Sequence, residues 1–101
     1  MGSTVALLRT DAFVKWADGL RDLRAFAKIM TYLDRLAQGH EGDAKPVGAG
    51  VSEARINYGP GYRIYFLRRG HTVVVLLCGG DKSTQSRDIK HALELATKWK
   101  E

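Results

Sequence analysis

The sequence has a single cysteine, two prolines and no long hydrophobic run. Because one thiol cannot form an internal disulfide, we expect Cys78, which lies in an apolar segment, to be a buried and reduced thiol. The longest unbroken apolar run, residues 73–78, is far below the ~20 residues that a membrane-spanning helix needs. Residues 5–8 are too short for the apolar core of a signal peptide. These absences predict a cytoplasmic protein with no membrane segment.

Residue groupings typical of several enzyme classes are also missing. The sequence shows no cluster of metal ligands, no serine–histidine–aspartate arrangement and no pair of carboxylates near the predicted sheet. Among the histidines, His71 is predicted at a hairpin tip, His91 on the surface of the last helix and His40 in a loop. We therefore predict neither a metal nor a cofactor, and no histidine is placed as a general base.

The sequence does have an excess of positive charge. The net charge is +5 and the isoelectric point is about 9.6, which favours an anionic partner. Most of this charge lies in one quarter of the chain, between residues 45 and 69. This segment has one anion, Glu53, and therefore carries +4 through its five cations: Lys45, Arg55, Arg63, Arg68 and Arg69.

With 101 residues, of which 45% are hydrophobic, the chain fits one domain spanning residues 1–101. Residues 40–50 lack periodicity and predict a loop. The predicted regular elements outside the central region are a strand at residues 5–8, a helix from Thr10 to Trp16, a helix at residues 22–38 and a last helix from Ser83 onward.

Apolar residues recur every three or four positions in the two longer helices, and this spacing predicts their buried stripes. For the helix at residues 22–38 the predicted stripe is Leu23, Phe26, Ala27, Met30, Leu33 and Ala37. For the last helix it is Ile89, Ala92, Leu93, Ala96 and Trp99.

The region 51–78 reads as three strands joined by two tight turns. A loop at residues 59–61 would place Arg63 opposite Asn57 and Tyr65 opposite Arg55. Strand alternation then puts these four side chains on one polar face. The other face is predicted to meet the helices and is nearly all apolar: Ala54, Ile56, Tyr58, Tyr62, Ile64 and Phe66.

The second turn, Arg69-Gly70, predicts a two-residue hairpin connection. It would place Arg63 opposite Leu76 and Gly61 opposite Cys78. The last strand would therefore end beside the first turn, and it would bring Lys82 to the edge of the polar face. Gly79-Gly80 could also form an anion-binding nest, as some glycine-rich turns between a strand and a helix do.

Three cations thus converge with a hydroxyl and an amide: Arg55, Arg63, Lys82, Tyr65 and Asn57. Arginine forks bind phosphate oxygens bidentately and oppose the charge that grows in a transition state, and a tyrosine ring can stack on a base. The alternative is that these arginines only keep an exposed sheet face soluble. The residues alone leave both interpretations open.

Several strings in the chain closely resemble the RelE/ParE superfamily of toxins from type II toxin–antitoxin systems, and within it the HigB-like addiction module killer proteins. The strings are KPVG (residues 45–48), EARI (53–56), YGPGYRIYF (58–66) and LCGGDKSTQ (77–85). The resemblance covers residues 10–101. It implies a compact α+β fold with two N-terminal helices, an antiparallel sheet of three to four strands and a C-terminal helix.

The resemblance also implies a function. Many relatives enter the ribosomal A site and cleave mRNA without a metal, and each is held inactive by an antitoxin that often carries a helix-turn-helix. The partners expected are therefore a cognate antitoxin and mRNA on the ribosome, with DNA contacted only through the antitoxin. Carried over by position, the catalytic residues are Arg63, Lys82 and Arg55. The expected RNA-binding residues are Tyr65, Asn57, Lys45 and Arg68.

Two departures from the family pattern concern acid–base chemistry. Asn57 stands where RelE-like enzymes often have a second basic residue, and the last helix has no tyrosine where some relatives keep one. Because arginine does not readily lose a proton, Lys82 or a ribosomal group is the candidate proton acceptor. Two alternatives therefore stay open: a ParE-like toxin that binds DNA gyrase without nuclease activity, and a catalytically silent antitoxin-binding module.

Overall fold

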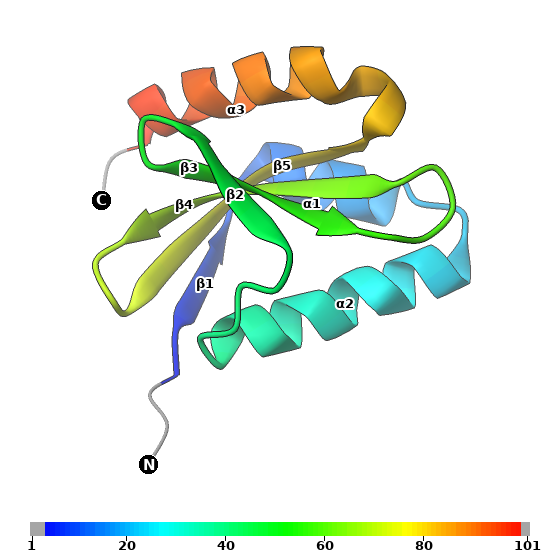
Figure 1. The fold of residues 1–101 in the computed structure, drawn as a ribbon, viewed down its shortest axis with the longest axis horizontal. Coiled ribbons are helices and arrows are strands. Elements are labelled where there is room, and N and C mark those ends of the chain that lie inside the picture. The colour runs from blue at the N-terminus through cyan, green and yellow to red at the C-terminus, as the bar shows by residue number, and fades with distance from the viewer. Residues whose placement is uncertain (1–3, 100–101) are drawn as a thin grey trace.

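The computed structural model describes residues 4–99 (Figure 1). Among these residues, no helix is long and apolar enough to cross a membrane. The elements in chain order are β1 (Ala6–Arg9), α1 (Asp11–Asp18), α2 (Leu23–Ala37), β2 (Ala44–Gly48), β3 (Val51–Ile56), β4 (Tyr62–Arg69), β5 (Val73–Asp81), the 3-10 turn η1 (Lys82–Thr84) and α3 (Gln85–Lys98).

The strands form one mixed sheet of five strands in the order β1-β5-β4-β3-β2. The α+β class is confirmed, but the expected antiparallel sheet of three to four strands is wrong because β1 runs parallel to β5. The loop predicted at residues 40–50 is also wrong in part, since it contains β2. This edge strand is mostly exposed and includes Pro46, so it lacks the alternating pattern that reveals a half-buried strand.

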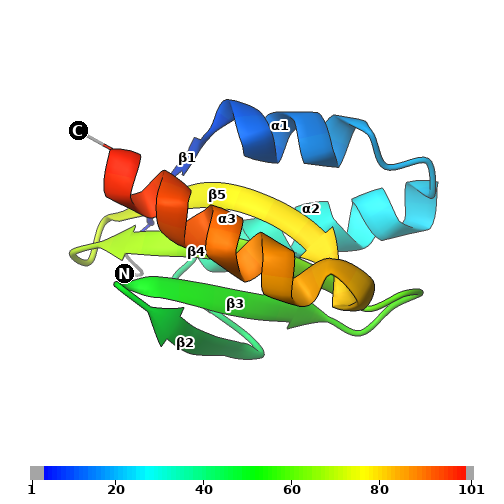
Figure 2. The ribbon, with the colours of Figure 1, turned by 90° about the horizontal axis from the view of Figure 1, so that it is seen from above.

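Helices cover both faces of the sheet. Figure 1 shows α3 above the strands and α2 below them, and Figure 2 shows the sheet between the helices from a second direction. One core lies between the sheet and the helices α1 and α2, with Phe13, Ile29 and Ile64 among its buried members. A second core lies under α3 and includes Leu77 and Ala92. The polar face predicted for β3 and β4 therefore lies on the side that α3 covers.

The N-terminal helices begin where their capping residues indicate. The Thr10 hydroxyl accepts a hydrogen bond from the Phe13 amide at 3.0 Å, and the Asp22 carboxylate accepts one from the Arg24 amide at 2.9 Å. The predicted stripe of α2 is largely wrong, because Leu23 is 82% exposed and only Leu33 of the predicted set is buried. Apolar residues occupy much of the circumference of α2, so spacing alone did not identify the inward face. The buried residues are Ala25, Ile29, Leu33 and Leu36.

The predicted stripe of the last helix is confirmed. Ala92 and Ala96 are buried, and Ile89, Leu93 and Trp99 pack partly buried against the same core. The helix begins at Gln85 rather than Ser83, because Lys82–Thr84 form a 3-10 turn. Asp81 caps this turn, and its carboxylate accepts a hydrogen bond from the Ser83 amide at 2.8 Å.

Both predicted hairpin registers are wrong, although their main consequences survive. Arg63 lies opposite Arg55 rather than Asn57, because β3 ends at Ile56 and the connecting loop is longer than predicted. A displacement of two residues keeps every side chain on its face.

The second turn occupies residues 70–72, and a bulge in the ladder brings Gly80 opposite Arg63. Asp81 lies opposite Tyr62, so Lys82, the next residue, still lies beside the first turn as predicted.

Candidate functional site

Two rows of side chains cross the sheet on the face that α3 covers. In the first row, Glu53 pairs with Lys45 on one side and with Tyr65 on the other. In the second row, Arg63 pairs with Arg55 and with Gly80. Because paired residues in a ladder share a face and lie about 5 Å apart, these side chains form one cluster.

Glu53 lies at the centre of this cluster and is fully buried. Its Oε2 accepts hydrogen bonds from the Tyr65 hydroxyl at 3.0 Å and from the Gln85 amide nitrogen at 2.8 Å. Its Oε1 lies 4.0 Å from both Arg63 Nε and Lys45 Nζ and has no hydrogen-bond partner. Arg63 Nε, also buried, has none either. The carboxylate therefore supplies the negative charge beside an almost buried guanidinium.

Arg63 is 7% exposed, and its free end reaches the turn between β3 and β4. Its Nη1 donates to the Gly61 carbonyl at 3.3 Å. A methyl group placed on Gly61 would lie 3.5 Å from Arg63 Nη1 and 3.6 Å from Lys82 Cβ. These distances bring Arg63 and Lys82 to the same turn, with Arg55 beside Arg63 in the sheet. Arg55, Arg63 and Lys82 therefore lie near the same end of the sheet, whereas their catalytic roles stay a prediction.

The Tyr65 hydroxyl is held in its neutral, donating form. Burial raises the pKa of Tyr65, and the negative charge of Glu53 raises it further. The side chain is 0% exposed, so the expectation that Tyr65 stacks on a base is wrong for this structure. Tyr65 instead orients the Glu53 carboxylate through the hydrogen bond that its hydroxyl donates.

Gly79 and Gly80 do not form an anion-binding nest, because both lie within the strand β5. They allow helices to approach opposite faces of the sheet. A Cβ on Gly79 would lie 2.2 Å from the Trp16 ring, and a Cβ on Gly80 would lie 1.8 Å from Asp88 Oδ2. The two glycines therefore bring α1 and the start of α3 against the strand.

Asp88 is a second acidic residue of the site that sequence reasoning missed. It is 8% exposed and accepts a hydrogen bond from the Thr84 hydroxyl. Its position above Gly80 places it on the face that carries Arg63. Glu53 and Gln85 were also missed. The available signal for Glu53 was its position as the one anion among five cations, whereas no local pattern marks a buried aspartate on an amphipathic helix.

The remaining predicted RNA-binding residues do not all join the cluster. Lys45 does, with a side chain that is 53% exposed beside Glu53. Asn57 follows the end of β3 and lines a cleft next to α2. Arg68 forms an ion pair with Glu41 far along β4 from Arg63. The cluster thus contains Arg55, Arg63, Lys82 and Lys45, while Asn57 and Arg68 lie outside it.

The exposed side chains of this cluster are cationic, and arginine and lysine side chains suit an anion such as phosphate. Within residues 4–99 no three histidine, cysteine, aspartate or glutamate side chains lie close enough to hold a metal ion. The Glu53 carboxylate lies beside Arg63 and accepts hydrogen bonds from Tyr65 and Gln85, and the Asp88 carboxylate accepts one from the Thr84 hydroxyl. The exposed part of the cluster is cationic.

Comparisons with known proteins agree with this fold. The chain is 47% identical over 93 residues to an uncharacterised protein of Haemophilus influenzae, covering 92% of this chain and 94% of that protein. The structure superposes on Escherichia coli toxin RelE, a double arginine-to-alanine mutant in the free state, with a TM-score of 0.72. That alignment has 13% identity and covers 90% of this chain and 96% of the toxin.

A second similar structure comes from the toxin–antitoxin complex RelBE2 of Mycobacterium tuberculosis, with a TM-score of 0.64 and 23% identity. It covers 78% of this chain and 99% of the matched chain. At these identities the two likenesses establish a RelE-like fold. A family model matches residues 13–101, and on that match the chain belongs to the phage-derived Gp49-like proteins (DUF891).

Proposed function

We propose that this protein is the toxin of a type II toxin–antitoxin system, of the HigB-like kind, and that it cleaves mRNA on the ribosome without a metal. The observation that carries the proposal is the convergence of Arg55, Arg63 and Lys82 at one end of the sheet, around the buried Glu53. The RelE-like fold supports it.

The proposed reaction is an attack by the ribose 2′-hydroxyl on the adjacent phosphorus. The O2′–P bond forms, the P–O5′ bond breaks, and a 2′,3′-cyclic phosphate and a free 5′-hydroxyl result. Arg63 and Arg55 stabilise the non-bridging phosphate oxygens, where charge increases in the transition state. Lys82 or a group supplied by the ribosome accepts the 2′-proton, and the conjugate acid of that group or a solvent water returns a proton to the O5′ leaving group.

Glu53 acts in this proposal as a positioning residue. It is shielded from RNA by its burial, but it restrains Arg63 from behind while Tyr65 and Gln85 orient its carboxylate. A fixed guanidinium loses little side-chain entropy when phosphate binds, which is the advantage of a preorganised site.

Arg63→Ala tests the mechanism in a cleavage assay with purified protein and programmed ribosomes. The variant should lose about 2 to 4 kcal/mol of transition-state stabilisation, the amount expected for one oxyanion donor. Arg9→Ala, which removes an arginine from the opposite edge of the sheet, is the control and should cleave normally. An unchanged cleavage rate for the Arg63 variant would remove the mechanism.

A second candidate is a toxin that binds DNA gyrase and has no nuclease activity. It is favoured by the shortage of exposed groups that could act as acid or base. Tyr65 and Glu53 are buried, and among the clustered residues described Lys82 is the one exposed group left that could accept a proton. Inhibition of supercoiling in vitro, with mRNA left intact, would select this candidate.

The proposed partner is a cognate antitoxin with a helix-turn-helix, through which the complex would contact DNA. The similarity to a chain of a toxin–antitoxin complex supports such a partner. Co-expression with the product of the adjacent reading frame should relieve growth arrest. Absence of arrest without that product would instead indicate a catalytically silent antitoxin-binding module.

A further inference from the structure

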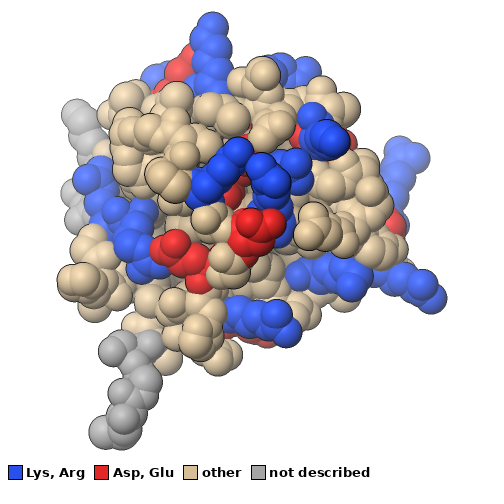
Figure 3. All heavy atoms as spheres, viewed as in Figure 1, with Lys and Arg blue, Asp and Glu red and all other residues tan. Residues whose placement is uncertain are grey.

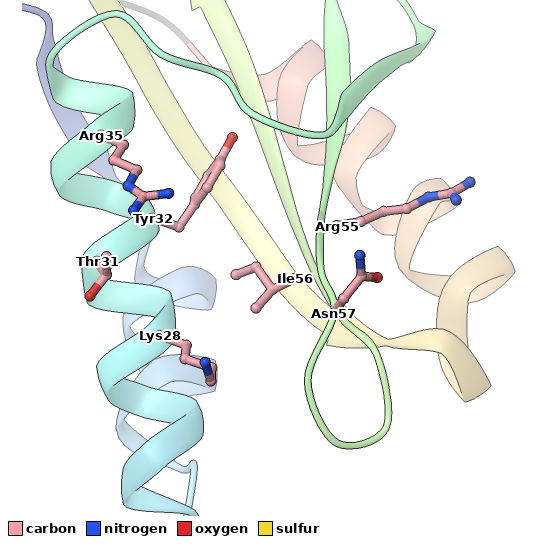
Figure 4. Close-up of a pocket in the computed structure, with 7 residues that line it drawn as sticks. All are labelled: Lys28, Thr31, Tyr32, Arg35, Arg55, Ile56 and Asn57. Atoms are coloured by element: carbon pink, nitrogen blue, oxygen red, sulfur yellow. The ribbon is translucent and has the colours of Figure 1, made fainter.

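A cleft of about 340 Å³ lies between α2 and the end of β3, on the face of the sheet opposite the cation cluster. In Figure 4, side chains from α2 line one side of this cleft and Ile56 and Asn57 line the other. Arg55 also borders it, but its side chain points away from α2. The cleft is therefore a space separate from the cluster, although both meet at Arg55.

The cleft is positively charged. Lys28 and Arg35 are exposed residues of α2, and none of the lining residues is acidic. Lys28 and Arg35 are seven positions apart in the sequence, so they lie two turns, or roughly 10 Å, apart along one side of the helix. Lys28 Nζ lies 5.3 Å from the centre of the Tyr58 ring, which holds the ammonium near the turn. Figure 3 shows basic side chains over the region of α2.

One of the acidic residues near the cleft, Glu41 at its other end, is already paired. The Tyr32 hydroxyl, at the cleft, donates to the Glu41 carbonyl at 2.7 Å. The Glu41 carboxylate forms its ion pair with Arg68. Glu41 therefore does not cancel the charge of Lys28 and Arg35.

An open stretch of sheet edge connects the cleft to the cation cluster. The ladder between β2 and β3 begins with Ala44 opposite Ala54. Beyond it, the Arg55 amide still donates to the Asp43 carbonyl at 2.9 Å, but Ile56 and Asn57 lie past the last pair. A bound chain can therefore pass from the Arg63 side around the end of β3 into the cleft.

We propose that this cleft binds the nucleotides of a single-stranded RNA that flank the phosphate held by Arg55 and Arg63. The inference rests on the proposed function and adds a second contact region to the same substrate. Two cations spaced along a helix suit successive phosphates of a strand better than one small anion. An acidic helical peptide fits less well, because Ile56 is the one aliphatic side chain among the lining residues and such a partner needs an apolar groove.

The test measures binding of uncleavable 2′-O-methyl RNA oligonucleotides of two to six nucleotides to the full chain by fluorescence anisotropy. For the parent protein, affinity should rise with length as the strand reaches the cleft. The Lys28→Gln/Arg35→Gln variant should lose this gain, binding the hexamer roughly tenfold more weakly. For this variant, the slope of log affinity against log salt concentration should be less steep by about 1.4, the value expected when contacts to two phosphates of a single strand are lost.

Lys90→Gln/Lys98→Gln is the matched control, because it removes the same charge from exposed positions on α3. It should keep the gain with length. The proposal is overturned if the cleft variant keeps the gain, if the control loses it equally, or if the parent shows no gain. It is also overturned if an acidic peptide, and not RNA, depends on Lys28 and Arg35.

The cleavage assay separates this inference from the proposed function. Length-dependent RNA binding through the cleft, with no cleavage of ribosome-bound message, would refute the proposed nuclease activity and support the proposal that the cleft binds RNA. Cleavage by the parent, with RNA binding unaffected in the cleft variant, would refute the cleft and support the nuclease.

Discussion

Glu53 is the residue on which the cation cluster depends. A fully buried carboxylate is costly unless charges and donors surround it, and here Arg63, Lys45, Tyr65 and Gln85 do so. The same arrangement makes the burial of Arg63 tolerable. Neither residue would be stable in its position without the other.

Glu53→Gln should therefore destabilise the protein even though it keeps the shape of the side chain. The amide can still accept from Tyr65, but Arg63 loses its buried counter-ion. We expect a loss of about 3 to 5 kcal/mol in the free energy of unfolding, measured by urea denaturation. Glu94→Gln, at an exposed position of α3, should change it by less than about 0.5 kcal/mol. Equal stabilities for the two variants would contradict this account.

Cys78 links stability to alkaline pH. Burial raises the pKa of this thiol to about 12, and the charge of Asp88 adds to the effect. The pKa of Cys78 is higher in the folded protein than in the unfolded chain. The protonated thiol therefore makes its full contribution to the free energy of unfolding below about pH 9, and this contribution is lost as the pH rises towards 12.

Between pH 9 and pH 10 the parent should lose about 1 kcal/mol more stability than Cys78→Ala, because one group with a raised pKa changes stability by up to about 1.4 kcal/mol per pH unit. Urea denaturation of both proteins at several pH values measures the difference. Parallel pH curves would show that the thiol is not protected by the fold.

At the level of elements, the end of β5 determines how two helices are placed. Gly79 and Gly80 have no side chains to separate the strand from Trp16 on α1 and from Asp88 on α3. The start of α3 can therefore lie close enough for Gln85 to reach Glu53. The Gly-Gly pair thus supports the site through packing rather than by contacting an anion.

Gly80→Ala should cost about 1 to 3 kcal/mol of stability, since its Cβ would overlap Asp88 Oδ2. The double variant Gly80→Ala/Asp88→Ala removes the obstacle and should be less unstable than the sum of the two single variants. A double-mutant cycle by chemical denaturation measures this coupling. Strictly additive losses would mean that the two positions do not contact each other.

For the whole molecule, β1 closes the edge of the sheet beside the apolar strand β5. Leu7 and Leu8 pair with Val74 and Val75, and the Val5 amide donates to the Ala37 carbonyl at 2.7 Å. Without β1, the unpaired backbone of an apolar strand would be exposed, which favours aggregation.

Removal of residues 1–9 should therefore lower the melting temperature and cause aggregation, although the family match begins only at residue 13. Loss of the Val5 side chain alone, which is 7% exposed, should cost about 1.5 to 3 kcal/mol. Thermal unfolding monitored with light scattering tests this expectation. Removing residues 1–3 keeps every described contact and is the control; similar behaviour of both truncations would show that β1 is dispensable.

The sequence alone determined the fold class, the order of most elements and the side of the sheet on which the residues of β3 and β4 lie. These features follow from local patterns: capping residues, apolar periodicity and strand alternation. A register error of two residues leaves alternation unchanged, so Arg55 and Arg63 were placed correctly on one face even though their predicted partners were wrong.

Only the tertiary structure decided which of these residues are accessible. Because α3 covers the face that strand alternation marks as polar, Tyr65 and Glu53 are buried and Arg63 is nearly so. The mixed orientation of the sheet and the inward side of α2 were decided in the same way, by contacts between segments far apart in the sequence. Such contacts depend on how whole elements pack, and no local pattern of residue types encodes them.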